Sequence, residues 1–419
     1  MFRPLIGYLA LLVIAFLLGG SDSIKKKRDW GVIGLGIALQ VCVVFAMMNS
    51  SIVVSFFECI AQGIMKVRDA TIEGTKFVFG YVGGGDSPFP LNEGGSTFIL
   101  AFQALPTVIL FGILAAVLTY LNILPVLAKV VGYVFRKVFK INESVGMVAA
   151  ARIFIGQLEA PLLIKHKLAS LSNSDVFIIL ALAFSTAAAS IMPICASAIE
   201  AICPDAMKHI IMSSVVSVIS ALIVCSVMGY PCDQADDEVS SSENLSSDDR
   251  PYSSFMGALS RGLSDGCFVW WCIVGSMIGM VALIALVNQL LAIFSGGDGN
   301  PLTLQKIFGL AMYPFAWIIG IRDADLLAIS QILGTKLAVN EIVAYFDLAK
   351  CEVARDSVVK AIYAITNFGN FSCIGVTVGG MAALAPTQKC ITSLIGKAFI
   401  AGLLATGLSA TIIGIFLSI

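Results

Sequence analysis

Several ionisable and amide side chains interrupt apolar stretches of this chain. Arg152, Gln157 and Glu159 lie within "ARIFIGQLEAPLLIKHK" (151–167), and Glu341 lies within "LGTKLAVNEIVAYFDLAK" (333–350). A carboxylate at the middle of a lipid bilayer costs about 2.5–3.5 kcal/mol even on the lenient insertion scale. Its surroundings must compensate that cost, so the two glutamates predict a polar site. The alternative is that each glutamate is an interfacial residue beside a short loop.

The chemistry of these groups favours a hydroxylated or amide-bearing solute. Gln157, Asn340 and Asn370 each offer hydrogen-bond donors and acceptors, whereas the glutamates accept. Asn370 lies in "NFGNFSCIG" (367–375), where two glycines and polar side chains predict a break that frees backbone groups for a ligand. A helix kink without a ligand is the alternative. Phe368 could stack on a flat ring or serve only in packing.

The composition predicts that the elements holding these groups are membrane helices. Hydrophobic residues make up 58% of the 419 residues and charged residues only 13%, with a mean hydropathy of +0.94. Soluble domains carry about 25% charged residues. A net charge of -1 gives no reason to expect nucleic-acid binding. No HExxH, Walker or zinc-like motif is present, so we expect neither an enzyme nor a metal or organic cofactor.

About eight transmembrane helices are expected, because a bilayer core about 30 Å thick needs roughly 20 apolar residues per span. The clear spans are 2–20, 30–57, 98–121, 175–200, 207–229, 267–294 and 391–418, with 353–382 interrupted by asparagines. The first run could be a signal peptide, but the second long apolar run that follows favours a first transmembrane helix. The basic loop at 25–28 is expected in the cytoplasm.

An acidic, serine-rich linker at 229–254 divides the chain into two halves that follow the same order of segments. Residues 123–140 and 302–320 are amphipathic and predict two interfacial helices. Each is followed by a polar-interrupted segment too short to cross the bilayer, which predicts a re-entrant helical hairpin. The expected fold is therefore an all-α polytopic membrane protein with an inverted structural repeat, typical of secondary transporters.

The expected boundaries follow from this reading. Residues 1–94 form peripheral N-terminal helices and a loop, and 229–254 form a cytoplasmic linker. The first repeat occupies 95–228, with its hairpin at about 142–170 and a broken helix at about 175–200. The second repeat occupies 255–419, with its hairpin at about 322–350 and a broken helix at about 353–382.

Three of these motifs resemble the concentrative nucleoside transporters. "IFIGQLEAPLLIK" is similar to that family's first hairpin, "GTKLAVNEIVAYFDL" to its second hairpin, and "NFGNFSCIG" to its second broken helix. The resemblance runs from about residue 95 to the end of the chain. It implies a homotrimer in the inner membrane, in which each protomer has its own nucleoside site.

The resemblance also implies roles for individual residues. Contacts to the base would come from Gln157, Leu158 and Glu159 of the first hairpin, and a further contact from Ile191 in the first broken helix. Contacts on the ribose side would come from Glu341, Asn370 and Cys373, with Phe368 beside them. The family's sodium-site positions fall on Arg152, Ile155, Thr186 and Ala187. Leu158 and Cys373 replace hydroxyl-bearing residues of the family, which leaves the base preference open.

Arg152 departs most from the family pattern, because it replaces an asparagine that ligates sodium. A guanidinium is always charged and has no lone pair for a cation, so we expect it to replace the ion. Proton coupling through Glu159 or Glu341, or no ion coupling, would follow. The alternative is that Arg152 extends to the cytoplasmic interface.

These observations predict a nucleoside importer of the inner membrane. A transporter of the same architecture for a nucleobase or nucleotide is the first alternative. A passive channel or a membrane scaffold is the second, and it predicts that Glu159→Gln and Glu341→Gln leave flux unchanged.

Overall fold

The computed structural model is an assembly of helices with no strand among the residues that it describes. These residues are 2–19, 28–90, 97–157, 159–229, 252, 254–294, 302–384 and 390–417. The acidic linker predicted at 229–254 lies almost wholly outside them, as does most of the basic loop at 25–28. The all-α architecture predicted from the sequence is confirmed.

The described helices fall into two groups, before and after the linker. Those before the linker are α1 (Phe2–Leu18), α2 (Trp30–Asn49), α3 (Ser51–Phe79), η1 (Gly80–Gly83), α4 (Leu100–Gln103), α5 (Thr107–Tyr120), α6 (Ile123–Phe139), α7 (Glu143–Ala151), α8 (Glu159–Leu162), η2 (Lys165–Ser170), α9 (Asn173–Ser185), α10 (Met192–Ala198) and α11 (Ala206–Met228). Those after it are α12 (Phe255–Phe294), α13 (Leu304–Ile319), α14 (Leu326–Ala338), α15 (Glu341–Leu348), α16 (Arg355–Ile365), α17 (Phe371–Leu384) and α18 (Ile391–Phe416).

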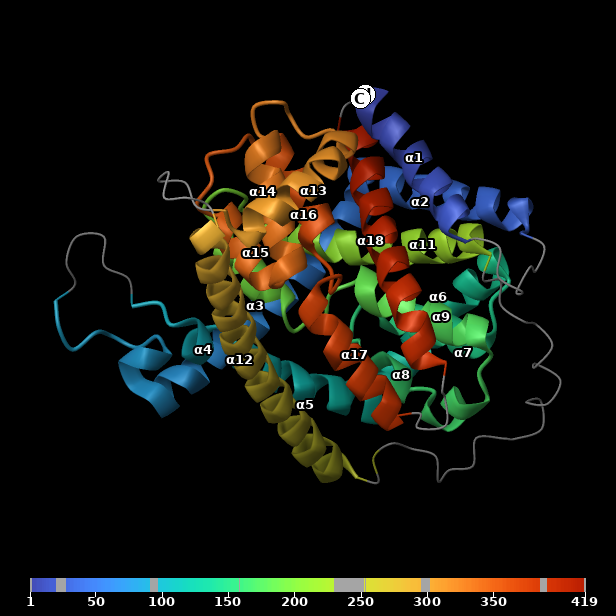
Figure 1. Ribbon diagram of the computed structural model, residues 1–419. Helices are drawn as coiled ribbons and strands as arrows, with labels where there is room; N and C mark the ends of the chain where they lie inside the picture. Colours follow the sequence, from blue (N-terminus) through green and yellow to red (C-terminus); the bar gives the residue numbers. More distant parts are fainter. Residues whose placement is uncertain are drawn as a thin grey trace.

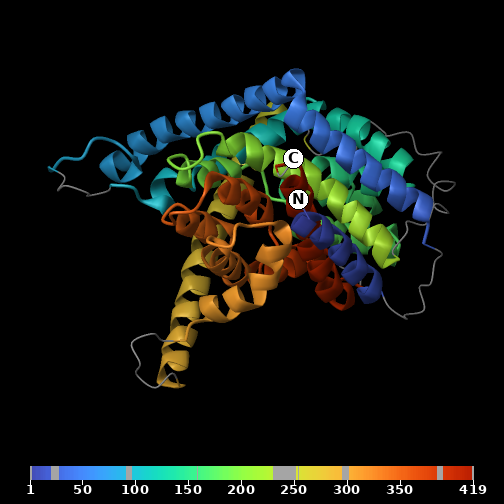
Figure 2. The same cartoon turned by 90° about the horizontal axis from the view of Figure 1, so that it is seen from above.

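Five helical stretches of the described residues are long and apolar enough to cross a membrane. They are 30–49, 100–120, 206–228, 255–293 and 391–416. Further helices, such as α1 and α9, are apolar but shorter. The long α12 extends away from the packed body of the molecule (Figure 2), and its apolar surface is largely exposed. An exposed apolar face of this length fits lipid or another chain.

The single span predicted at 30–57 is wrong, because the chain turns at Ser50. The Ser50 backbone is extended, and its hydroxyl accepts from the Val53 amide at 3.5 Å, which caps the start of α3. Figure 2 shows α2 and α3 meeting at this corner. Only three polar residues, 49–51, separate the apolar runs on either side, so a reading by hydropathy joined the two helices into one span.

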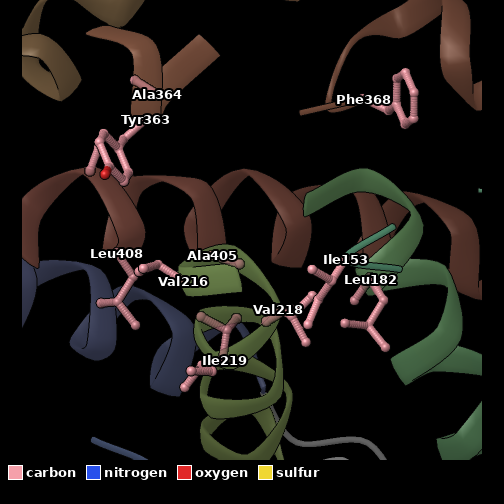
Figure 3. Close-up of a cluster of buried hydrophobic side chains, with 14 of the residues drawn as sticks. Ile153, Leu182, Val216, Val218, Ile219, Tyr363, Ala364, Phe368, Ala405 and Leu408 are labelled. Atoms are coloured by element: carbon pink, nitrogen blue, oxygen red, sulfur yellow. The ribbon is translucent and has the colours of Figure 1, made fainter. Parts of the chain in front are cut away.

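The core lies where α11 and α18 cross (Figure 1). The helix α18 packs against α1, α9, α11 and α16. Val216 and Ile219 of α11 lie beside Ala405 and Leu408 of α18 (Figure 3), and all four side chains are buried. Helices from both halves thereby share one apolar core.

Close glycine contacts hold each amphipathic helix against the segment that follows it. A Cβ added at Gly132 of α6 would lie 2.8 Å from the carbonyl carbon of Gly146 in α7. In the second half, a Cβ added at Gly334 of α14 would lie 2.5 Å from the backbone nitrogen of Gly309 in α13. No side chain fits at such distances, so these crossings require glycine.

An ionic cluster joins the starts of α11 and α16 at one end of the bundle. Asp205 accepts from Arg355 at 2.8 Å and lies 3.3 Å from the His209 ring. The His209 ring, followed by smaller contributions from Cys203 and Lys208, holds the pKa of the Asp205 carboxyl well below its usual range. The cluster therefore fixes the start of the broken helix α16 relative to α11.

Candidate functional site

Two interrupted helices and two helix–turn–helix segments converge on the candidate site. The chain leaves helical geometry between α9 and α10 at 186–191, and again between α16 and α17 at 366–370. The two breaks are joined directly, because the Phe368 amide donates to the Thr186 carbonyl at 3.3 Å. Segments far apart in the sequence therefore meet at their non-helical parts.

Glu341 is held at the start of α15, where a helix N-terminus favours negative charge. Asn340 precedes it and caps the helix, since its side-chain oxygen accepts from the Val343 amide at 2.9 Å. Glu341 is only 3% exposed, and its Oε2 accepts from Asn370 Nδ2 at 3.0 Å. The second helix–turn–helix and the second break thus share a buried polar contact.

Asn370 organises the start of α17. Its Oδ1 accepts from the Ser372 hydroxyl at 2.6 Å and from the Cys373 amide at 2.9 Å. Phe368 is 5% exposed and lies on the other side of Gly369. The residues predicted on the ribose side are therefore neighbours. Phe368, Asn370 and Cys373 lie at the second break and the start of α17, and Glu341 contacts Asn370.

The two turns between paired helices both contact α17. Thr377 Oγ1 donates to Gln157 Oε1 at 3.3 Å, and Ser372 Oγ donates to the Val339 carbonyl at 3.2 Å. Gln157 comes from the first turn and Val339 from the second. The residues Thr377 and Ser372, which the sequence did not single out, thus connect α17 to both turns.

The structure describes the other predicted contact residues, those of the first turn and of the first break, only in part. Ile191 is buried at the end of the first break, immediately before α10. Leu158 lies outside the described residues, and Glu159 begins α8 with a side chain that the structure does not describe. Among the described side chains of this group, Gln157 makes a polar contact, to Thr377.

Arg152 is fully buried and directs its guanidinium at the end of α9. Its Nη1 donates to the Ile155 carbonyl at 2.9 Å, and its Nη2 donates to the Ala183 and Thr186 carbonyls at 3.3 and 3.2 Å. Its Nε donates to the Leu182 carbonyl at 3.4 Å. The exposed fraction of Arg152 is 0%, so the side chain does not extend to the surface.

This arrangement is favourable for a positive charge. The last carbonyls of a helix lack partners within it and carry the negative end of its dipole, and α9 ends at Ser185. The Arg152 guanidinium also lies over the Phe368 ring, with 5.9 Å between Cζ and the ring centroid. Of the predicted cation-site positions, Ile155 and Thr186 supply acceptors to Arg152, and Ala187 is buried beside Thr186.

Lys336 is a second buried cation at the site, and the sequence reading missed it. Its Nζ donates to Asn367 Oδ1 at 2.5 Å in the second break. The signal was present, because a lysine inside the apolar run "GTKLAV" requires compensation as Arg152 does.

Comparison with known proteins agrees with this geometry. The sequence matches family models described as Na+ dependent nucleoside transporter N-terminus (residues 6–82), Nucleoside recognition (101–202) and Na+ dependent nucleoside transporter C-terminus (209–414). An uncharacterized transporter of Haemophilus influenzae is 30% identical over 99% of this chain and 97% of its own length. The nucleoside permease NupC of Helicobacter pylori is 27% identical over 99% and 97%.

Among solved structures, CNTnw in an inward-facing substrate-bound state is similar over the whole chain. It has a TM-score of 0.87 and 26% sequence identity, and the match covers 100% of this chain and 98% of that one. The chain therefore belongs to the concentrative nucleoside transporter family and is an integral protein of the inner membrane, a transporter rather than an enzyme.

Proposed function

We propose that this protein imports nucleosides and binds them where the two turns and the two helix breaks meet. The observation that carries this proposal is the buried hydrogen bond from Asn370 to Glu341. A carboxylate and an amide held in this way offer acceptors and a donor to the vicinal hydroxyls of ribose. The family and its named nucleoside permease support the same substrate class.

The binding roles follow from the positions of the side chains. Glu341, Asn370 and Cys373 would contact the ribose, with Phe368 beside them, while Gln157, Leu158, Glu159 and Ile191 would contact the base. Support comes from Gln157, which is 3.3 Å from Thr377 of α17, the helix that begins at the ribose-side residues. Leu158 offers no hydrogen bond, so base discrimination would fall on Gln157 and Glu159.

We further propose that the fold contains an inverted repeat with two re-entrant hairpins. The first unit runs from α5 to α11 and the second from α12 to α18, within the domain boundaries predicted above. The helices α6 and α13 would lie in the interface, the paired helices α7/α8 and α14/α15 would enter and leave on one side, and about eight segments would span. The equivalent glycine crossings, Gly132 on Gly146 and Gly334 on Gly309, support the repeat.

Transport would not require sodium, because Arg152 would take the place of the ion. The guanidinium donates to the Ile155 and Thr186 carbonyls, and both residues fall on sodium-site positions of the family. A tethered charge keeps these acceptors satisfied at all times, so nucleoside affinity would not depend on dissolved sodium.

If uptake is concentrative, we propose a proton as the coupling ion, carried by Glu159 or Glu341. One charge moving inward is worth about 2.3 kcal/mol per 100 mV of membrane potential, or about fifty-fold in concentration. One proton per nucleoside would therefore suffice for useful accumulation.

The test is uptake of a labelled nucleoside panel into proteoliposomes, with sodium and proton gradients imposed separately. We expect saturable nucleoside uptake that is unchanged by sodium and stimulated by an inward proton gradient. Nucleobases and nucleotides serve as competitors, and stronger competition from either would identify a different solute. An absolute requirement for sodium would contradict the role proposed for Arg152.

A further inference from the structure

Lys336 is a buried cation, and the residue roles proposed for substrate binding do not explain why it lies there. It lies in the last turn of α14 and is 3% exposed. Its Nζ donates to Asn367 Oδ1 at 2.5 Å. Removing an ammonium from water is expensive unless it is paired and hydrogen-bonded, so its position in the site needs an explanation.

The partner of Lys336 shapes the second helix break. Asn367 Nδ2 donates to the Ala364 carbonyl at 3.1 Å, and Asn367 Oδ1 also accepts from the Gly369 amide at 3.0 Å. A Cβ added at Gly369 would lie 2.8 Å from Asn367 Oδ1 and 3.1 Å from Lys336 Nζ. The ammonium therefore lies directly against the turn that leads into Asn370.

The position of Lys336 parallels that of Arg152. Arg152 follows α7 and reaches the end of α9, the first half of the first broken helix. Lys336 lies near the end of α14 and reaches Asn367, just beyond the end of α16, the first half of the second broken helix. In each half, a cation from a paired helix is placed at the C-terminal end of a broken helix, where the helix dipole favours positive charge.

We infer that Lys336 is a tethered cation that joins the second paired helix to the second break and thereby positions Asn370 and Glu341 for the substrate. It is a positioning residue, because its hydrogen bond goes to Asn367, the residue that shapes the turn before Asn370. The inference rests on the proposed nucleoside site, since Asn370 and Glu341 are the groups that it would hold.

Chemical rescue distinguishes a position that requires a cation from one that requires only a packed side chain. In Lys336→Ala, the lost side chain leaves room for a small cation beside Asn367. We expect nucleoside affinity to fall about tenfold or more, as for a lost charged hydrogen bond. Methylammonium chloride should restore part of that affinity, whereas tetramethylammonium chloride at equal ionic strength should not, because it is too large and donates no hydrogen bond.

Lys360→Ala is the matched control. Lys360 is also 3% exposed and lies in the middle of α16. It donates to the Gly320 carbonyl at 2.9 Å and to Asp356, in the first turn of α16, at 2.7 Å, so its hydrogen bonds point away from the break. We expect its loss to lower thermal stability while the affinity for nucleoside stays close to that of the wild type. Rescue by methylammonium should be absent.

A second variant covers the case in which Lys336→Ala does not fold. Lys336→Met keeps the length of the side chain and removes the charge, so its affinity should fall without rescue. Wild-type affinity in either folded variant, or an affinity loss in Lys336→Ala that methylammonium does not reverse, would overturn the inference. If the wild type binds no nucleoside, the proposed function fails. The position of the cation beside Asn367 is then still tested by whether methylammonium stabilises Lys336→Ala in the absence of nucleoside.

Discussion

The side chain of Arg152 has an environment that explains why a permanent charge is tolerated in an apolar core. Its acceptors include backbone carbonyls of the turn that follows α7 and of the end of α9. Carbonyl oxygens at a helix C-terminus stabilise a cation through partial charges that are already fixed in place. The same set of oxygens would suit a small dissolved cation if the arginine were absent.

Replacing Arg152 by asparagine should convert the protein to sodium dependence. The shorter amide leaves the Thr186 and Ile155 carbonyls without their donor and adds an oxygen that can ligate an ion. We expect wild-type uptake to be indifferent to sodium, and Arg152→Asn uptake to rise several-fold when sodium replaces choline in proteoliposomes. Arg136→Asn, on the partly exposed side of α6, is the control. Sodium-independent uptake at wild-type affinity in Arg152→Asn would contradict the prediction.

Replacing Glu341 by glutamine should nearly abolish transport. The substitution removes the buried carboxylate that Asn370 contacts, and charged hydrogen bonds contribute about 1.5–3 kcal/mol. We expect kcat/KM for nucleoside uptake to fall by roughly 10- to 100-fold or more. Glu352→Gln, on the exposed loop before α16, should leave uptake unchanged. Unchanged flux in Glu341→Gln would favour the passive channel.

For individual residues, the sequence predicted which side chains belong to the site better than it predicted their hydrogen-bond partners. Glu341 and Asn370 were expected on one side of a ligand, and they are hydrogen-bonded to each other. Lys336 and Thr377 were not singled out, because their importance depends on which segments become neighbours. No periodicity in a single sequence encodes the contact from Thr377 to Gln157.

At the scale of elements, hydropathy predicted the positions of helices well, but it did not predict the turn between two adjacent apolar helices. The predicted segment 207–229 corresponds to α11 (Ala206–Met228), and 123–140 corresponds to α6 (Ile123–Phe139). The corner at Ser50 was missed because apolar residues continue on both sides of it. The breaks near Thr186 and Asn370 were anticipated, since polar and small residues interrupt otherwise apolar runs there.

The crossing of α13 and α14 should be intolerant of even one methyl group. A Cβ at Gly334 would lie 2.5 Å from the Gly309 nitrogen, so Gly334→Ala must separate the helices. We expect a loss of about 1–3 kcal/mol of stability, measured as a lower Tm in detergent. Gly396→Ala in α18 is the control, because a Cβ there meets nothing within 4 Å. An equal Tm for the two variants would contradict this packing.

At the scale of the whole molecule, the exposed apolar surface of α12 is consistent with the expected homotrimer. A long helix that leaves the packed body needs lipid or a second chain to cover it. We expect native mass spectrometry from mild detergent to show three copies of the 44.2 kDa chain. A monomer without any trimer under these conditions would contradict the expectation.

In the role proposed for it, Arg152 differs from a dissolved ion in one thermodynamic respect, because it is covalently attached and stays with the protein throughout a transport cycle. A dissolved ion is released inside, so its gradient performs net work once in every cycle. Any work that the membrane potential does on the attached charge of Arg152 in one direction is recovered when the protein returns to its starting state. Over a complete cycle it adds nothing to the accumulation ratio. Uptake against a gradient must therefore draw on a second, dissociable charge, without which the internal solute can rise only to the external level.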